Sequence, residues 1–292
     1  MKGRIATIGF FDGVHKGHCY LFEHLQAEAA KRELEPLIVT FFEHPRTTLQ
    51  SDYVPQLLTG IEERRELLSE FGEVLMLPFA DIQALTAAEF IRYLKDEYQV
   101  SVIVMGYDHR FGSDRLRYPQ EYRAAGASYG VEVITIGEFI DGEWHVSSTE
   151  IRAALENGNI AVANELLGRP YTIQGKVVKG NAIGRNLGFP TANILPENPH
   201  KIIPKSGVYA ARVDTPTMDN APAFVNIGTN PTIGNERETI EVHIPSFNGD
   251  LYNQHLEIRF ERYIREERQF ASLEDLREQI KADIDSSLRR DA

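Results

Sequence analysis

The chain begins with a short apolar strand that runs directly into a glycine-bearing turn and a helix. The apolar residues 5–8 are followed by Gly-Phe-Phe-Asp-Gly-Val-His-Lys-Gly-His at 9–18. Free backbone N–H groups and the helix dipole both point out of such a junction, so it attracts anions. His15 and His18 are three residues apart and are expected to face the same way on the first helical turn. The segment predicts a site for a nucleotide triphosphate; the simpler alternative is two polar residues at a solvated helix start.

Strands and helices alternate through the first half of the sequence. Alternation of this kind predicts a doubly wound, mostly parallel α/β sheet, with ligands beyond the carboxyl ends of the strands. Ser or Thr followed three residues later by Glu predicts helix starts. The predicted strands are 4–10, 36–42, 73–78, 100–105 and 131–136. The predicted helices are 17–32, one from a capping box at 59–62 to about residue 71, one from a capping box at 86–89 to about residue 98, and one after a capping box at 147–150.

The sequence changes character near residues 167–170. Beyond this point it consists of short β-rich runs separated by Gly, Pro and Asn turn signals, which predicts an antiparallel β-barrel or sandwich. A chain of 292 residues is longer than one core usually holds, so we predict two domains, residues 1–168 and 169–292. The predicted strands of the second domain are 171–178, 207–213, 223–227, 239–244 and 256–264, and a closing helix is capped at Ser272 and ends near Leu288.

Charge and cysteine content exclude several classes of protein. The net charge is −12 at pH 7, whereas broad binding of nucleic acids or anionic membranes needs a basic face. An acidic protein that handles anionic substrates must concentrate positive charge locally or borrow it from a metal ion. The single cysteine, Cys19, excludes an intramolecular disulfide and a cysteine-based zinc cluster. No run is long enough for a signal-peptide core or a membrane span, so the cytoplasm is the expected compartment.

Aromatic and basic side chains follow the second predicted strand. The β-rich run ends in Phe41 and Phe42, and His44, Pro45 and Arg46 follow it. Rings and a proline-stiffened loop can form one wall of a pocket for a planar ring system, and an arginine can bind a phosphate. An ordinary strand end followed by a turn explains the same residues equally well.

Two more segments of the first half carry groups suited to a nucleotide. Asp108 and Arg110 lie in a short loop between two glycines after the fourth strand. There Asp108 can bind a ribose hydroxyl or a metal, and Arg110 can bind a phosphate. The alternative is a salt bridge between them within the loop. Ser148, Thr149 and Arg152 lie at a helix start, where hydroxyls, backbone N–H groups and a guanidinium can clamp a phosphate. The same residues also make an ordinary helix cap.

A glycine-rich segment in the second half precedes two neutral, oxygen-bearing side chains. Gly180, Gly184 and Gly188 are spaced four apart, which allows backbone N–H groups to approach phosphates closely, although no Gly-Lys-Ser/Thr of a P-loop follows. Thr191 and Asn193 alternate on one strand and so point to one face. There they can hold an octahedral Mg²⁺ that takes most of its ligands from water and phosphate. A glycine-rich barrel corner is the alternative.

Glu241 lies in the middle of an apolar strand segment, Ile-Glu-Val-His at 240–243. On the inward face a carboxylate would be costly to bury unless it had a chemical role. A general base that takes a hydroxyl proton for attack on a γ-phosphate fits this position. The alternation by itself fits an outward-facing glutamate equally well.

In order along the chain, these segments resemble the bacterial bifunctional riboflavin kinase and FMN adenylyltransferase family, often called FAD synthetase. Residues 9–18 resemble the His-x-Gly-His signature of the nucleotidyltransferase superfamily, and 106–112 and 147–152 resemble its later motifs. Residues 184–193, which end in Phe-Pro-Thr-Ala-Asn, resemble the kinase signature, with 206–209, 226–228 and 241–243 following. The likeness covers almost the whole chain.

The resemblance implies a Rossmann-like nucleotidyltransferase domain, a riboflavin kinase barrel and two reactions that use ATP. In the second domain the riboflavin 5′-hydroxyl would attack the γ-phosphate of ATP, with Glu241 as base and Thr191 and Asn193 serving Mg-ATP. In the first, the FMN phosphate would attack the α-phosphate of a second ATP to give FAD and pyrophosphate, with His15 and His18 stabilising the phosphates. The implied nucleotide-binding residues are Gly9, Phe10, Asp12, Gly13, Asp108, Arg110, Ser148, Thr149, Arg152, Gly184 and Gly188, and the implied flavin-binding residues are Phe42, His44, Pro45 and Arg46.

Three positions depart from the family pattern. His109 stands where Phe or Tyr is expected, no glycine follows shortly after Arg115, and Asn230 stands where Arg is expected.

Two other functions compete with the one implied. A single-activity adenylyltransferase for another small phosphate, such as phosphopantetheine or nicotinate mononucleotide, would explain the first half alone but leaves the Phe-Pro-Thr-Ala-Asn segment without a use. A non-catalytic flavin-binding protein would have no need of the intact catalytic side chains.

Overall fold

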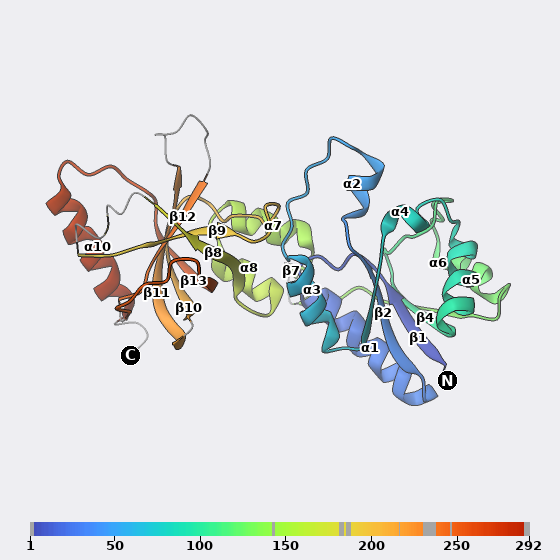
Figure 1. Cartoon of the computed structure of the whole chain (residues 1–292). Coiled ribbons are helices and arrows are strands. Elements are labelled where there is room, and N and C mark those ends of the chain that lie inside the picture. The colour runs from blue at the N-terminus through green and yellow to red at the C-terminus, as the bar shows by residue number, and fades with distance from the viewer. Residues whose placement is uncertain are drawn as a thin grey trace. The chain divides into compact units, whose positions relative to one another are not determined.

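The computed structural model describes residues 3–141, 144–180, 184, 188–215, 217–229, 238–245 and 247–288 (Figure 1). The chain divides into two units, Met1–Ser148 and Thr149–Ala292. The first unit contains a parallel sheet and the second a closed barrel. Each unit has a hydrophobic interior of its own.

The first unit confirms the predicted doubly wound α/β architecture. Its five-stranded sheet has the order β3-β2-β1-β4-β5, and all neighbouring strands are parallel. The strands are β1 (Arg4–Ile8), β2 (Glu35–Phe41), β3 (Glu73–Leu77), β4 (Val100–Gly106) and β5 (Glu132–Ile136). The helices are α1 (Lys16–Arg32), α2 (Pro45–Leu49), α3 (Ile61–Ser69), α4 (Phe79–Ile82), α5 (Ala87–Tyr98) and α6 (Pro119–Ala127). Because the strand order reverses between β1 and β4, the crevice outside their carboxyl ends is the expected place for a ligand.

Alternate side chains of the strands pack into two hydrophobic clusters on opposite faces of the sheet. Ile38 and Val104 belong to the cluster that includes buried residues of α1 and α3. Val39 and Met105 belong to the cluster that includes buried residues of α5 and α6. Helices therefore cover both faces, which explains why these strands are continuously apolar rather than alternating.

The predicted helix starts are confirmed at one capping box and wrong by one residue at another. Thr86 accepts a hydrogen bond from the N–H of Glu89, whose carboxylate accepts from Thr86, as the sequence predicts. At α3 the N-cap is Gly60, whose N–H donates to Glu63 at 3.0 Å. The hydroxyl of Thr59 contacts the turn after β1 instead, because tertiary partners there compete with the local cap. Helix α6 and a small antiparallel pair, β6 (Ile140–Asp141) and β7 (Trp144–His145), were not predicted.

The second unit is a closed barrel, which confirms the predicted antiparallel barrel and excludes the sandwich. The strand order is β10-β11-β12-β9-β8-β13, with β13 also paired to β10. The strands are β8 (Tyr171–Val178), β9 (Ala192–Pro196), β10 (Gly207–Thr215), β11 (Met218–Thr229), β12 (Glu238–His243) and β13 (His255–Arg265). The helices are α7 (Ser148–Glu156), α8 (Ile160–Leu167) and the closing helix α10 (Leu273–Leu288), whose predicted cap Ser272 accepts from the N–H of Asp275.

One asparagine of helix α8 is hydrogen-bonded to two strands of the barrel. Asn164 donates to the carbonyl of Phe260 on β13 at 2.8 Å and accepts from the N–H of Tyr171 on β8 at 2.7 Å. Tyr171 and Phe260 are themselves buried in the barrel interior. The amide thus satisfies backbone groups of two neighbouring strands at once.

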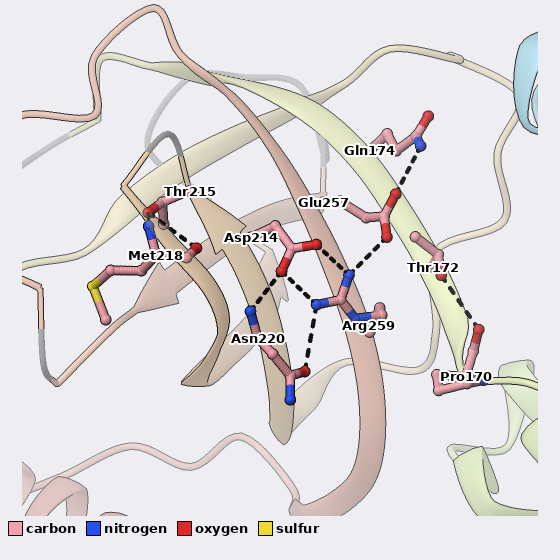
Figure 2. A network of polar contacts seen from close by, with 9 residues as sticks. All are labelled: Pro170, Thr172, Gln174, Asp214, Thr215, Met218, Asn220, Glu257 and Arg259. Carbon is pink, nitrogen blue, oxygen red and sulfur yellow. Dashed lines mark hydrogen bonds and ion pairs between the residues drawn. The ribbon is translucent and has the colours of Figure 1, made fainter.

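A network of polar contacts joins β8, β10, β11 and β13 on the outside of the barrel (Figure 2). Both guanidinium Nη atoms of Arg259 donate to Asp214 at 2.6 Å, and Nη1 also donates to Glu257 at 2.9 Å. Gln174 donates to the other carboxylate oxygen of Glu257, and the N–H of Asn220 donates to Asp214. Hydrogen bonds from Arg259 and Asn220 lower the pKa of Asp214 from 3.8 to about 2.

We expect Asp214→Asn to lower the free energy of unfolding by about 1 kcal/mol at pH 7, because the bidentate ion pair is lost but solvent screens part of its strength. A lowered folded-state pKa means that this stabilisation is present above pH 4 or so and is lost as the pH falls toward about 2. Denaturant unfolding between pH 6 and pH 2 measures the difference between wild type and variant, which should shrink with acid. Asp219→Asn, at an exposed position of the same hairpin, is the matched control. A difference that stays constant with pH would contradict the assignment.

Candidate functional site

A cavity of about 330 Å³ opens at the carboxyl ends of β1, β4 and β5. Its walls come from the turn after β1, the loop after β4 and the segment after β5, so it occupies the crevice where the strand order reverses. The predicted residues that line it are Gly9, Phe10, His15, His18, Asp108 and Arg110.

His15 and His18 lie face to face at the start of α1. Their ring centroids are 3.6 Å apart and their planes differ by 18°. His15 is the N-cap of the helix, and its Nδ1 accepts a hydrogen bond from the backbone N–H of His18 at 3.3 Å. The prediction that both imidazoles face the same way is confirmed. Both rings line the cavity, where they could donate hydrogen bonds to phosphate oxygens.

The turn between β1 and α1 has an unfavourable backbone conformation. Phe11 and Val14 have positive φ angles of 54° and 41°, which side-chain-bearing residues rarely adopt, and Gly13 has a φ of 85°. Such residues persist only where surrounding contacts hold them in place.

Asp12 supplies one of those contacts and does not line the cavity. It is 3% exposed, and its carboxylate accepts from the N–H groups of Leu58 and Thr59 and from the hydroxyl of Thr59 at 3.0–3.1 Å. Thr59 Oγ1 accepts in turn from the N–H of Gly13 at 3.0 Å, and Ser148 Oγ donates to the carbonyl of Asp12 at 2.9 Å. The expected contacts of Asp12, Gly13 and Ser148 with a nucleotide remain predictions. So do those of Thr149 and Arg152, which lie on α7 beyond the division of the chain.

The segment after β2 brings several rings together beside Phe10. His44 packs edge-on against Phe10 with centroids 4.8 Å apart and lies 5.3 Å from Tyr53. The guanidinium of Arg46 is 4.7 Å from the centroid of Tyr53. Phe42 is 41% exposed. Of the predicted wall residues, His44 packs against other rings and Arg46 lies over Tyr53; a wall that also includes Phe42 and Pro45, and flavin binding by it, stay predictions.

The conformation of the loop after β4 does not depend on the salt bridge between Asp108 and Arg110 that the sequence allows as an alternative. Arg110 donates to the backbone carbonyls of Tyr107 and His109 at 3.3 and 2.7 Å, and no ion pair joins it to Asp108 within the described part of the chain. Burial lowers the pKa of His109 to about 4. His109 is therefore neutral at pH 7 and lines the cavity as an uncharged ring, as a Phe or Tyr at this position would.

Arg64 of α3 belongs to this region and was not predicted. It is fully buried, its guanidinium lies 4.0 Å from the ring centroid of Phe10, and Nη2 donates to the carbonyl of Phe41 at 2.7 Å. Burial lowers the pKa of Arg64 to about 10, against the opposing effect of the Asp12 charge, so the side chain is still protonated at neutral pH. The signal in the sequence is its position four residues before Leu68, which places both on the inner side of the helix.

Glu241 lies on the outer face of the barrel. Its neighbours Ile240 and Val242 are 2% and 1% exposed and point into the interior, so the alternation turns Glu241 outward. Of the two orientations that the sequence leaves open, the outward one is observed. Burial of a carboxylate in the barrel core, the argument for an inward base, therefore does not apply.

Strand register nevertheless places Glu241 among the predicted kinase residues. It stands opposite Asn193 of β9 on one side and opposite Asn226 of β11 on the other. The hydroxyl of Thr191, next to the start of β9, is 3.3 Å from Glu241 Oε2. Asn226 was not among the predicted residues, although it lies in the segment 226–228 that carries the resemblance.

Two cavities meet at Thr191. One of about 330 Å³ is lined by Thr191, Asn226 and Glu241 and by apolar residues of α10. The other, of about 740 Å³, is lined by Thr191, Asn193, Lys179 and Asp250, among others. The carboxylate of Glu241 thus faces an apolar-walled space, and a larger polar space adjoins it. This arrangement suits a ring-bearing hydroxyl substrate next to a phosphate donor.

Part of the predicted glycine segment packs against Asn193. A Cβ atom at Gly180 would collide with the side-chain amide of Asn193, and one at Gly184 would collide with the carbonyl of Phe189. Gly188 has a φ of 86° and open space around it. The intervening positions 181–183 and 185–187 lie outside the described residues, as does Asn230.

The donor set around Thr191 fits Mg²⁺ better than a soft metal. A hydroxyl, an amide and the carboxylate of Glu241 come together there, and these are oxygen ligands of the kind that Mg²⁺ accepts. Among the described residues, no group of three or more His, Cys, Asp or Glu side chains could hold a metal. A cation at this place would therefore keep most of its ligands from water and phosphate, as Mg²⁺ does in ATP sites.

Two family models cover most of the chain. Residues 1–150 match FAD synthetase and residues 167–290 match riboflavin kinase. Separately, no helix in the described ranges is both long and apolar enough to span a membrane.

Relatives and a solved structure cover the chain nearly from end to end. The bifunctional riboflavin kinase/FMN adenylyltransferase of Escherichia coli K12 is 38% identical over 286 residues, which are 97% of this chain and 91% of the relative. That of Haemophilus influenzae is 33% identical, with 98% and 94% covered. A crystal structure from Streptococcus pneumoniae, named a macrolide-efflux protein, has a TM-score of 0.88 at 33% identity, with 97% and 93% covered. The chain therefore belongs to the family of bifunctional riboflavin kinase/FMN adenylyltransferases.

Proposed function

We propose that this chain converts riboflavin into FAD in the cytoplasm, in two successive steps that each consume ATP, with phosphorylation in residues 169–292 and adenylylation in residues 1–168. The observation that carries this proposal is that each half of the chain, which matches one of the two enzyme families, contains a cavity with side chains suited to that enzyme's reaction. A cavity with a carboxylate beside hydroxyl and amide groups lies in the half that matches riboflavin kinase, and a cavity with two imidazoles lies in the half that matches FAD synthetase.

In the kinase step, Glu241 takes the proton of the riboflavin 5′-hydroxyl as the oxygen attacks the γ-phosphorus of ATP. The bond between the γ-phosphorus and the bridging oxygen breaks, and FMN and ADP result. Thr191 and Asn193 orient the phosphates, and the apolar wall of the smaller cavity receives the flavin ring. A base within hydrogen-bonding reach of the hydroxyl typically contributes about 10²–10⁴-fold to the rate.

In the adenylylation step, a phosphate oxygen of FMN attacks the α-phosphorus of a second ATP and pyrophosphate leaves. The attacking oxygen is already anionic, so no base is needed, and catalysis consists of positioning and charge stabilisation. His15 and His18 donate hydrogen bonds to the phosphates, while Asp108 and Arg110, from the loop after β4, hold the nucleotide. The rings at Phe42, His44 and Tyr53 cover the flavin.

Both steps use ATP with a divalent cation, which we propose is Mg²⁺. When bound, this ion neutralises charge on the phosphates and holds their geometry. Thr191 and Asn193 would hold it in the kinase site.

The alternatives differ in what they predict for catalysis. A single-activity adenylyltransferase for another small phosphate would give no FMN from riboflavin, and the riboflavin kinase match over residues 167–290 argues against it. A non-catalytic flavin-binding protein would bind flavin without consuming ATP. Chromatography of flavins over time, after mixing the protein with riboflavin, ATP and Mg²⁺, distinguishes all three. FMN that appears first and then converts to FAD supports the proposal.

We expect His18→Ala to lower the rate of FAD formation from FMN by about 10²–10³-fold, because a donor to the developing charge is lost. FMN formation from riboflavin should stay within twofold of wild type, since that site lies in the other unit. His24→Ala changes a histidine of the same helix whose Nδ1 contacts a backbone carbonyl, and it should leave both rates unchanged. Loss of both activities in His18→Ala would contradict the assignment.

We expect Glu241→Gln, which keeps the shape but removes the base, to lower riboflavin phosphorylation by at least about 10²-fold. Adenylylation of supplied FMN should continue at the wild-type rate. Glu261→Gln changes another outward strand glutamate, paired with Arg212, and is the control. Unchanged kinase turnover in Glu241→Gln would show that this carboxylate has no role in proton transfer.

We expect excess chelator to stop both reactions and added Mg²⁺ to restore them. Thr191→Val should raise the Mg²⁺ concentration needed for half-maximal kinase rate without changing that for adenylylation. A kinase rate that persists in chelator would argue against a cation at Thr191 and Asn193.

A further inference from the structure

We propose that Arg64 is a positioning residue for FMN adenylylation: it holds Phe10 and the turn after β1 in the shape that the nucleotide cavity requires. Arg64 does not line the cavity and touches no residue given a catalytic role above. It acts through Phe10, which lines the cavity together with His15 and His18. The inference rests on the proposed placement of adenylylation in residues 1–168.

The contacts of Arg64 join the carboxyl ends of two neighbouring strands. The guanidinium lies over the ring of Phe10, just beyond β1, with 4.0 Å to the centroid, and Nη2 donates to the carbonyl of Phe41 at the end of β2. Phe10 meets His44 on the other side, with centroids 4.8 Å apart. The arginine thus fixes the ring that stands between the nucleotide cavity and the predicted flavin wall.

The turn that follows Phe10 needs such support. Phe11 and Val14 have positive φ angles, and strained residues of this kind relax when their surroundings loosen. Asp12 holds the turn from the residues that precede α3, through Leu58 and Thr59. Arg64, one turn into α3, contacts the ring of Phe10, which immediately precedes this turn. The charge of Asp12 partly counters the effect of burial on the pKa of Arg64, so the two charges act on each other across the turn.

Core packing alone does not favour an arginine at the buried position 64. Nε and Nη1 have no hydrogen-bond acceptor among the described residues, so a buried cation here is costly. An unbranched apolar side chain would fill similar volume without that cost. Replacing a buried charge by a hydrophobic residue is often neutral or stabilising, so stability and activity should separate on substitution.

The experiment compares Arg64→Met and Arg64→Lys with Arg65→Met. Arg65 is the next residue of α3, 62% exposed and paired only with Glu62 in the described structure, so its variant is the matched control. We expect Arg64→Met to lower kcat/KM for FMN adenylylation by at least tenfold while the thermal midpoint is unchanged or raised. The kcat/KM of Arg64→Lys should lie between those of wild type and Arg64→Met. An ammonium keeps the positive charge, but it has no planar face to stack on a ring and cannot form paired hydrogen bonds as a guanidinium does. Riboflavin phosphorylation by the same molecules is the internal control and should not change.

A double-mutant cycle with Phe10→Leu tests whether Arg64 acts through that ring. We expect the double variant Phe10→Leu, Arg64→Met to catalyse adenylylation no more slowly than the slower single variant. Both changes remove the same contact, that between the guanidinium and the ring that lines the cavity. Fully additive losses would overturn the inference, as would wild-type adenylylation in a folded Arg64→Met or Arg64→Lys. If Arg64→Met does not fold, Arg64→Lys and its cycle with Phe10→Leu decide by the same criteria.

His18→Ala, measured in parallel, separates this inference from the proposed function. If His18→Ala abolishes adenylylation and the Arg64 variants do not affect it, the site is correct and the positioning role is wrong. If His18→Ala has no effect, the placement of the reaction itself is wrong.

Discussion

The buried carboxylate of Asp12 is the contact on which the first site depends. It ties the turn after β1 to the backbone of Leu58 and Thr59, 46 and 47 residues further along the chain. The turn contains residues with positive φ, and it also sets where α1 begins and therefore where His15 and His18 stack. The N–H and O–H groups that donate to this carboxylate compensate for its burial. Asp12 is thus one of the contacts that hold the strained turn from which α1 and the stacked imidazoles begin.

The two sites use different devices to hold their reactive groups. In the first unit, a helix start and a strained turn bring two imidazoles to within 3.6 Å of each other. In the second unit, strand register sets Glu241 beside Asn193 and Asn226. Each residue of an antiparallel strand pair lies opposite one defined residue of the neighbouring strand. In the function proposed above, the imidazoles are assigned the charge stabilisation that adenylylation needs, and Glu241 is assigned the role of base in phosphorylation. The outward orientation of Glu241 is consistent with this, since a base must reach a substrate rather than a core.

Much of this architecture could be predicted from local sequence, and the errors have physical causes. Continuous apolar runs such as 100–105 predicted buried strands, since helices cover both faces of a parallel sheet. The start of α3 was misplaced because the Thr59 hydroxyl is used by Asp12 and Gly13 rather than by its own helix. The direction of Glu241 stayed open because alternation defines two faces without saying which is inside. Arg64 was missed because an arginine on an amphipathic helix ordinarily reaches solvent, and its stacking on Phe10 depends on a distant turn.

The sequence by itself determined the alternation of strands and helices in the first half, the antiparallel character of the second half and the family resemblance, because periodicity and short motifs are local properties of the chain. Tertiary structure decided which predicted residues share a cavity: Gly9, Phe10, His15, His18, Asp108 and Arg110 do, and Asp12 does not. It also decided that Thr191 meets Glu241, 50 residues away, and that a buried arginine supports the signature turn. These outcomes depend on strand order, register and the closing of the barrel, which bring distant segments together and which no local pattern encodes.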